Sequence, residues 1–281
     1  MEEVKTPAMD QAQLWNGPAG EAWLAMQPQL DRLFAPFEAL LVGAVRWHQP
    51  ARVLDIGCGT GATTLAIARE LAGRGGCTGA DLSQIMIDRA RERAAAEPAG
   101  VEASFVGGDA SRIEPPAPFD MAVSRFGVMF FEDPVAAFAR LRAAMASGAP
   151  LAAIAWRSPA ENAFMTTAER AAAPLLPPLP PMEPGAPGQF AFADADRVRA
   201  ILGESGWQGI ELNPVDIECT MPEGELLPYL SHLGRIGIFL RQFDTATRDR
   251  VLATVRAAFE PFVDGGTVRF TAACWMIEAR A

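Results

Sequence analysis

Three glycines alternate with other residues in the stretch Gly57-Cys58-Gly59-Thr60-Gly61, directly after an apolar run that contains one acid, Asp55. Glycine has no Cβ atom, so a loop of this composition lets its backbone approach a bound small molecule closely. Asp81 and Asp109 follow further along, each where another apolar run ends. A carboxylate accepts hydrogen bonds from hydroxyl and amino groups. These residues together predict a backbone-lined site for a ligand that carries such groups.

Two classes of ligand compete for this loop. Gly57, Gly59 and Ala62 satisfy the G-x-G-x-x-G/A pattern of dinucleotide-binding loops, and Asp81 lies about twenty residues further on, as that pattern requires. A pyrophosphate, however, favours positive potential at a helix N-terminus, which a carboxylate at position 55 opposes. S-adenosylmethionine carries an ammonium and a sulfonium and no phosphate, so the acidic loop favours it. A nicotinamide-dependent oxidoreductase is the alternative.

The elements that position these residues follow from the hydrophobic pattern. Five apolar runs alternate with helical patterns as far as residue 156, and this alternation predicts an α/β fold with a doubly wound, mostly parallel sheet. Two later runs bring the sheet to seven strands. The expected strands are 51–56, 77–80, 101–106, 119–124, 151–156, 209–217 and 268–279; the expected helices are 15–47, 62–71, 84–96, 134–146, 194–205, 226–243 and a segment around 248–262. The carboxyl ends of parallel strands share one edge, so we expect the site there.

Four ordered motifs resemble those of class I S-adenosylmethionine (SAM)-dependent methyltransferases, in the UbiE-like branch. They are 53–61, 80–83 with Met86 and Ala90, 108–110, and 119–134. The resemblance covers residues 51–156, and more loosely 190–217 and 267–279. It implies the Rossmann-like methyltransferase fold, SAM as cofactor with S-adenosyl-L-homocysteine (SAH) as product, and methyl transfer to a small organic acceptor by in-line displacement.

The resemblance also assigns roles to residues at the ends of the first three strands. It implies that the backbone of Gly57–Gly61, with Cys58 inside it, passes beside the methionine part of the cofactor, and that Asp55 acts near its amino group. Asp81 is expected to accept hydrogen bonds from both ribose hydroxyls, although a helix cap is the alternative. Asp109 and the Ala110 N–H are expected to bind adenine, although Asp109 also suits a turn. Gly108 belongs to the same motif, and Leu82, Met86 and Phe105 are candidates to sandwich the adenine ring.

Further cofactor residues are expected from the fourth strand and from the N-terminus. Ser124, Arg125 and Phe126 end that strand, where such sheets present ligands. In related enzymes an aromatic N-terminal segment folds over the cofactor, which makes Trp15 a candidate. Trp23 lies eight residues later on the same helical face, and packing of the helix on the sheet is the alternative for both.

Catalytic groups are few, because the chain has only two histidines. His48 precedes the first strand, so His232 is the candidate general base, with Tyr229 beside it. A solvent-facing histidine is the alternative. Arg125 and Arg235 are candidates to orient an anionic substrate or to form surface ion pairs. This small set of bases keeps open a second function, a SAM-binding protein that does not methylate.

Composition narrows the class of protein. The 281 residues carry a net charge of −10, which argues against binding to the backbone of a nucleic acid. The four cysteines form no C-x-x-C pair, so we expect reduced thiols and no metal site. No apolar run has the length of a membrane span, and no secretory signal is recognised at the start. We therefore expect a cytoplasmic protein, monomeric or homodimeric, whose partner is a small molecule.

The expected division of the chain has one core and several additions. A helical cap segment is expected at 1–50, the SAM-binding core at 51–156, a proline-rich insertion at 157–193, the completion of the core sheet at 194–217 and 266–281, and a helical cap insertion at 218–265. The apolar side chains of that last insertion predict a largely apolar substrate pocket, or packing of the cap on the sheet.

Overall fold

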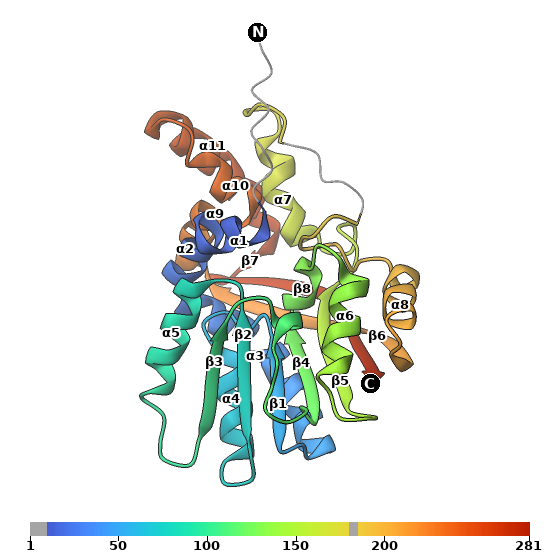
Figure 1. Ribbon diagram of the computed structural model, residues 1–281. Helices are drawn as coiled ribbons and strands as arrows, with labels where there is room; N and C mark the ends of the chain where they lie inside the picture. The colour runs from blue at the N-terminus through green and yellow to red at the C-terminus, as the bar shows by residue number, and fades with distance from the viewer. Residues whose placement is uncertain (1–9, 180–184) are drawn as a thin grey trace.

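One mixed sheet runs through the protein in the order β3-β2-β1-β4-β5-β8-β6 (Figure 1). The computed structural model describes residues 10–179 and 185–281. The strands are β1 (Arg52–Ile56), β2 (Gly76–Asp81), β3 (Glu102–Gly107), β4 (Met121–Arg125), β5 (Pro150–Trp156), β6 (Gln208–Pro222) and β8 (Thr267–Arg280), and the two-residue β7 (Val263–Asp264) pairs with β8. The expected doubly wound, mostly parallel sheet is confirmed.

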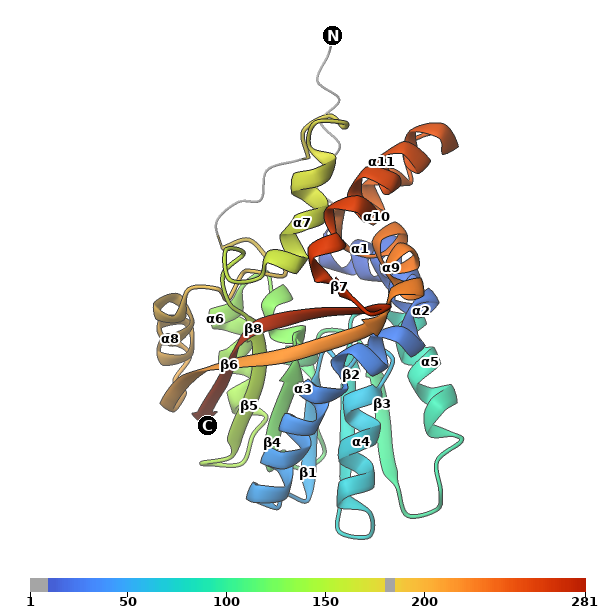
Figure 2. The ribbon, with the colours of Figure 1, turned by 180° about the vertical axis from the view of Figure 1, so that it is seen from behind.

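Strands β1 to β5 form the parallel half of the sheet. Every residue of β5 is buried, as expected for a parallel strand with both faces covered. Helices α3 (Gln27–His48) and α4 (Ala62–Leu71) lie on the face seen in Figure 2, α6 (Pro134–Ala143) lies on the face seen in Figure 1, and α5 (Gln84–Ala94) lies beside β3. Pro134 occupies the first turn of α6, and Asp133 caps that helix by accepting from the Ala136 N–H at 3.0 Å.

The antiparallel half is a long two-stranded ribbon. β5 pairs with β8 only over residues 274–280, whereas β6 pairs with β8 as far as Pro222 and Thr267. Residues 216–222 and 267–273 therefore extend past Trp156, beyond the carboxyl edge of the parallel strands (Figure 2). Between them the chain forms α9 (Leu226–His232), α10 (Gly234–Leu240) and α11 (Thr245–Ala258), which stand above that edge, while α8 (Ala195–Glu204) precedes β6.

Several predicted elements differ from the observed ones. The helix expected over 226–243 is two helices, because the chain turns at Leu233 and Gly234, and Gly234 has a φ of +69°. The helix expected over 15–47 is three: α1 (Gln11–Asn16), α2 (Pro18–Ala25) and α3. Gly17 has φ −120° and ψ −128°, outside the helical region, and so separates the first two. Strand β6 runs five residues past its expected end.

One helix was missed altogether. Helix α7 (Ala163–Ala172) lies within the expected proline-rich insertion, ahead of its prolines. The ring of Phe164 stacks on Phe270 of β8 with centroids 3.8 Å apart, which holds α7 on the antiparallel ribbon. Residues 180–184 of the expected proline-rich loop lie outside the described residues.

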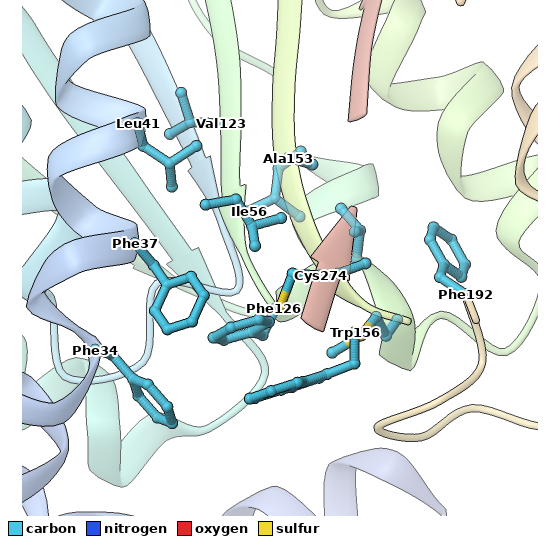
Figure 3. Packing of buried hydrophobic residues seen from close by; sticks show 14 of the residues in the cluster. Phe34, Phe37, Leu41, Ile56, Val123, Phe126, Ala153, Trp156, Phe192 and Cys274 are labelled. Carbon is cyan, nitrogen blue, oxygen red and sulfur yellow. The ribbon is translucent and has the colours of Figure 1, made fainter. Parts of the chain in front are cut away.

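An aromatic cluster joins α3 to the carboxyl ends of β4 and β5 (Figure 3). Phe126 stacks on Trp156 with centroids 4.8 Å apart, and Phe37 of α3 meets Phe126 edge to face at 5.1 Å. Phe34, one turn earlier on α3, meets Phe126 at 5.5 Å. These rings fix the position of the carboxyl edge relative to the N-terminal helices.

Candidate active site

The glycine loop forms a close turn at the end of β1. Gly57, Gly59 and Gly61 all adopt positive φ angles, between +55° and +84°, that other residues rarely adopt. A Cβ atom on Gly57 would stand 2.6 Å from the Gly127 Cα atom, and one on Gly61 would stand 2.8 Å from the ring of Phe105. The three positions therefore require glycine both for backbone conformation and, at two of them, for space.

Asp81 fastens this loop to the end of β2. Its Oδ2 atom accepts from the Gly59 N–H at 2.8 Å, and its Oδ1 atom accepts from the Ser83 N–H at 2.8 Å. The side chain is almost fully buried; burial raises the pKa of its carboxyl, and these two N–H donors oppose the rise. Each carboxylate oxygen keeps a further lone pair for a hydroxyl donor. Asp81 can therefore organise the turn and bind a ligand at the same time.

Asp55 lies beneath the loop with 1 % of its surface exposed. The Thr64 hydroxyl donates to its Oδ2 atom at 2.6 Å, while Oδ1 has no hydrogen-bond partner among the described residues. Burial raises the pKa of this carboxyl to about 6, and the hydrogen bond from Thr64 and the positive charge of Arg125 oppose the rise. A buried acceptor without a donor is costly in a folded protein, and it suits a cationic ligand group.

Ser124 joins the end of β4 to the end of β1. Its hydroxyl donates to the Ile56 carbonyl at 2.8 Å and accepts from the Gly127 and Val128 N–H groups at 3.1 and 3.2 Å. The side chain is fully buried. Its hydrogen-bonding capacity is used by the protein, so Ser124 shapes the site and offers no free hydroxyl to a ligand.

Arg125 and Phe126 follow directly. The Arg125 guanidinium lies 5.7 Å from the centroid of the Phe34 ring, and its Nη1 atom is 3.5 Å from the Phe34 carbonyl oxygen. No carboxylate of the described residues lies within 4 Å of it, and burial lowers its pKa against the opposing charge of Glu38. Phe126 has a φ of +68°, an uncommon conformation for a side chain of this size.

The end of β3 adds Gly108, Asp109 and Ala110. The Gly108 N–H donates to the Asp81 carbonyl at 2.8 Å, which brings the third motif against the second. Asp109 accepts from the Ser111 N–H at 2.9 Å and from the Arg112 Nε atom at 3.2 Å, so it forms the turn anticipated as its alternative role. Ala110 is buried beside it.

The remaining expected cofactor residues surround the loop. Met86 is buried, with its Sδ atom 3.9 Å from where a Cβ on Gly59 would stand, and Leu82 is half-buried in the adjacent turn. Phe105 and Cys58 pack with Leu65, Ile87 and Ala90 in a separate small cluster, and burial raises the pKa of the Cys58 thiol. Cys58 therefore offers its backbone to the site.

Trp23 of α2 lies beside the loop, and Trp15 of α1 packs against Trp23. The Trp23 Nε1 atom lies 3.7 Å from where a Cβ on Gly59 would stand, and the two indoles meet edge to face at 6.2 Å. Trp15 also meets Phe130 at 5.1 Å, and Trp23 stacks on Phe34 at 6.2 Å. The contacts of these indoles fit both expected roles, packing of the helices on the protein and closure over the site.

The two expected catalytic side chains are held within the cap. The Tyr229 hydroxyl contacts the Met165 Sδ atom at 3.8 Å, and burial raises the pKa of this phenol, so it stays protonated at neutral pH. The His232 Nδ1 atom lies 2.9 Å from both the Pro228 carbonyl oxygen and the Ser231 hydroxyl of its own helix. No contact found within the described part of the chain joins either side chain to the glycine loop. Arg235 forms an ion pair with Glu169 of α7 at 3.1 Å.

Three contributors to the site were missed from the sequence. Thr64 stands one turn into α4, nine residues after the acid to which it donates. Gly127 follows the β4 motif, and a Cβ there would stand 2.4 Å from the Ile56 carbonyl oxygen. A glycine directly after the end of a predicted strand could have indicated the role of Gly127. No sequence pattern indicated Asn16, which bonds to the turn after Asp81.

None of the helices in residues 10–179 and 185–281 is long and apolar enough to cross a bilayer. Across the same residues no group of three or more His, Cys, Asp or Glu side chains is arranged to hold a metal ion.

Comparison with known proteins gives matches in the part of the chain that contains the glycine loop. Residues 53–148 match the family model described as a methyltransferase domain. Aklanonic acid methyltransferase DauC of Streptomyces sp. (strain C5) is 36% identical over 115 residues, which cover 39% of this chain and 52% of that protein. The chain thus matches about half the length of this curated relative.

Solved structures agree on the fold. Magnesium protoporphyrin IX methyltransferase (ChlM) of Synechocystis PCC 6803, solved with bound SAH, superposes with a TM-score of 0.57 at 14% identity, covering 96% of this chain and 98% of that one. The YcgJ protein of Bacillus subtilis gives a TM-score of 0.54 at 15% identity, covering 86% and 97%. At these identities the likeness establishes the Rossmann-like methyltransferase fold; a UbiE-like branch is not distinguished.

Proposed function

We propose, from the premise that residues 53–148 form a methyltransferase domain, that the protein transfers a methyl group from SAM to a small organic acceptor. One observation carries this proposal. The Asp81 carboxylate, which ends β2, bonds directly to the Gly59 N–H of a loop that only glycine can form. A carboxylate that can accept from hydroxyl groups is thereby held next to a loop whose backbone is open to a ligand. This arrangement suits a ligand with a ribose beside a charged amino-acid part.

The residues present fit such a cofactor. The unpartnered Oδ1 atom of Asp55 suits its ammonium group, and the Arg125 guanidinium, which lies near Asp55 without a carboxylate partner among the described residues, suits its carboxylate. Asp81 would accept from the ribose hydroxyls, and Asp109 with the Ala110 N–H would bind adenine. Met86 and Leu82 would pack against the rings.

In the proposed reaction, the bound cofactor supplies a methyl group made electrophilic by the adjacent sulfonium. The chain contributes position and the exclusion of water, which supply much of the rate of an in-line displacement. The backbone of Gly57–Gly61 would orient the amino-acid part. Trp15 and Trp23 would cover the loop and shield it from solvent.

The acceptor would enter from the side of the cap. Leu230 of α9 and Ile236 and Leu240 of α10 are buried in the protein core, so these side chains pack the cap, and the proposal of a largely apolar acceptor rests on the apolar composition of the cap sequence. The name of the relative DauC, an aklanonic acid methyltransferase, also supports a small organic acceptor. We also propose that the protein is cytoplasmic and is a monomer or a homodimer. The division into core and cap is proposed as expected from the sequence. His232 and Tyr229 remain the proposed catalytic groups.

A second candidate is a SAM-binding protein that does not methylate. The observation that favours it is the placement of Tyr229 and His232 within the cap, each bonded to nearby residues of the cap or α7. A labelling experiment separates the two candidates. Methyl-labelled SAM incubated with the protein and a metabolite extract is expected to give a labelled small molecule.

Titrations of the protein with SAH and with NADH complete this test. Binding of SAH with no labelled product would favour the second candidate over methyl transfer. No binding of SAM or SAH, together with a change in NADH fluorescence on titration, would replace both with the nicotinamide-dependent oxidoreductase.

A further inference from the structure

Helices α1 and α5 exchange their capping groups. Ser83 occupies the position before α5, but its hydroxyl donates to the Trp15 carbonyl at 2.6 Å and does not cap its own helix. The Gln84 N–H, one of the free donors at the start of α5, is accepted by the Asn16 Oδ1 atom at 2.8 Å. Such donors are usually satisfied by the residue before the helix. Two segments 68 residues apart therefore complete each other.

The Asn16 carboxamide grips the turn before α5 from both sides. Its Nδ2 atom donates to the Leu82 carbonyl at 2.9 Å and, within α1, to the Ala12 carbonyl at 2.9 Å. Helix α2 follows closely, since a Cβ on Gly20 would stand 3.1 Å from the Ser83 hydroxyl. The N-terminal helices are thus fastened at Leu82 and Gln84 by one solvent-exposed side chain.

The same turn is bonded to the glycine loop. Asp81 accepts from the Ser83 N–H with one oxygen and from the Gly59 N–H with the other. A continuous series of hydrogen bonds therefore runs from Asn16 through the 81–84 turn to the loop. Fastening α1 and α2 also holds the Trp23 indole beside Gly59 of that loop, with Trp15 packed edge to face against Trp23.

We propose that Asn16 is a positioning residue, whose carboxamide latches α1 and α2 to the Leu82–Gln84 turn and so couples closure of these helices to occupation of the glycine-loop site. This inference rests on the proposed function, because the ligand expected at that site is SAM or SAH. Occupation and closure favour each other if both require the same arrangement of the 81–84 turn. The latch is exposed, and single hydrogen bonds of this kind are weak, so it can open to admit a ligand.

The test compares Asn16→Ala with Asn16→Asp. The alanine variant loses every side-chain bond of the latch, and we expect its affinity for SAH to fall about five- to tenfold, as for one or two lost hydrogen bonds. Gln13→Ala, an exposed position of the same helix, should behave as wild type.

The aspartate variant separates the latch from a merely structural role. It keeps an oxygen acceptor for the Gln84 N–H, so α5 stays capped, and its melting temperature should lie closer to that of wild type than the melting temperature of Asn16→Ala does. It loses the donor to the Leu82 carbonyl, so its SAH affinity should still fall. Wild-type affinity in either Asn16 variant would overturn the latch.

Hydrogen exchange gives a readout that needs no catalysis. Bound SAH should slow exchange in residues 11–25 of wild type, and much less in Asn16→Ala. Equal slowing in both proteins would overturn the coupling. If wild-type protein binds no SAH, the proposed function fails and the coupling fails with it. Faster exchange of residues 11–25 in ligand-free Asn16→Ala would then still show that Asn16 fastens α1.

Discussion

The two halves of the sheet serve the site in different ways. In the parallel half, the ends of β1, β2 and β4 are tied together by buried polar groups and by glycines whose backbones touch, as at Gly57 and Gly127. In the antiparallel half, β6 and β8 run on as a ribbon and carry α9 to α11. The cap meets the N-terminal helices partly through exposed ion pairs, such as Arg241 with Glu21.

The two halves should therefore differ in how much amino-acid substitution they tolerate. Buried hydrogen bonds and close backbone approaches tolerate little change, so the half that would hold the cofactor is tightly specified. Apolar packing and surface ion pairs tolerate substitution far better. Under the proposed function, the parallel half would determine the methyl donor, and the ribbon and its cap would determine the acceptor.

The largest expected effect tests the buried charge of the parallel half. The pKa of Asp55 is about 6 in the folded protein against an ordinary value of 3.8, so the folded state binds a proton more tightly than the unfolded state. Proton binding to Asp55 therefore stabilises the folded state fully below about pH 4. This stabilisation, about 3 kcal/mol, is lost as the pH rises through about 6. Relative to wild type, Asp55→Asn should therefore gain stability by about this amount between pH 4 and pH 7.

Denaturant unfolding of both proteins across this pH range measures the difference. A difference that stays constant with pH would show that Asp55 does not carry a buried, raised pKa, and would remove one distinction between the two halves.

Close backbone approach should matter next. Gly57→Ala places a Cβ atom 2.6 Å from the Gly127 backbone and should lower the free energy of unfolding by about 2 kcal/mol or more. Gly73→Ala is the matched control, because its φ of +73° is similar to the +69° of Gly57 but nothing lies within 4 Å. It should cost about 1 kcal/mol, the conformational penalty alone. Equal losses in thermal unfolding would mean that the approach at Gly127 is unimportant.

Asp109 should separate ligand binding from turn formation. If it binds adenine, Asp109→Ala should weaken SAH binding about tenfold in calorimetry, equivalent to one hydrogen bond. Asp88→Ala, an exposed acid on nearby α5, should leave the affinity unchanged. A lower melting temperature with unchanged SAH affinity would show that Asp109 stabilises the turn and does not bind adenine.

The cap should respond least. Arg241→Ala removes a 3.1 Å ion pair with Glu21 whose side chains are 36% and 63% exposed. Such a pair contributes at most about 1 kcal/mol and is screened by salt. The loss of stability should therefore be small at 0.1 M salt, on the order of a few tenths of a kcal/mol, and smaller still at about 1 M. A loss of several kcal/mol would show that the cap is as tightly specified as the parallel half.

The same contrast explains what could be predicted from the sequence. The motifs at Gly57–Gly61, Asp81 and Asp109 follow strands in chain order, and a parallel sheet brings strand ends together, so their meeting at one edge was predictable. The break at Gly17 had a local signal in the Gly17-Pro18 pair, which the long helical pattern outweighed. Helix α7 had none, because it depends on tertiary contacts such as Phe164 on Phe270. Asn16 bonds to residues 66 and 68 positions away, which no local pattern indicates.

Calorimetric titration with SAH tests the central claim most directly. Wild-type protein is expected to bind one SAH per chain, and Asp81→Ala should lower the affinity about 100-fold or more, because two charge-assisted hydrogen-bonding roles are lost. Asp120→Asn, at the opposite edge of the sheet where Asp120 accepts from the Arg52 N–H, should bind as wild type does. No binding of SAH, or binding that survives Asp81→Ala unchanged, would contradict the account.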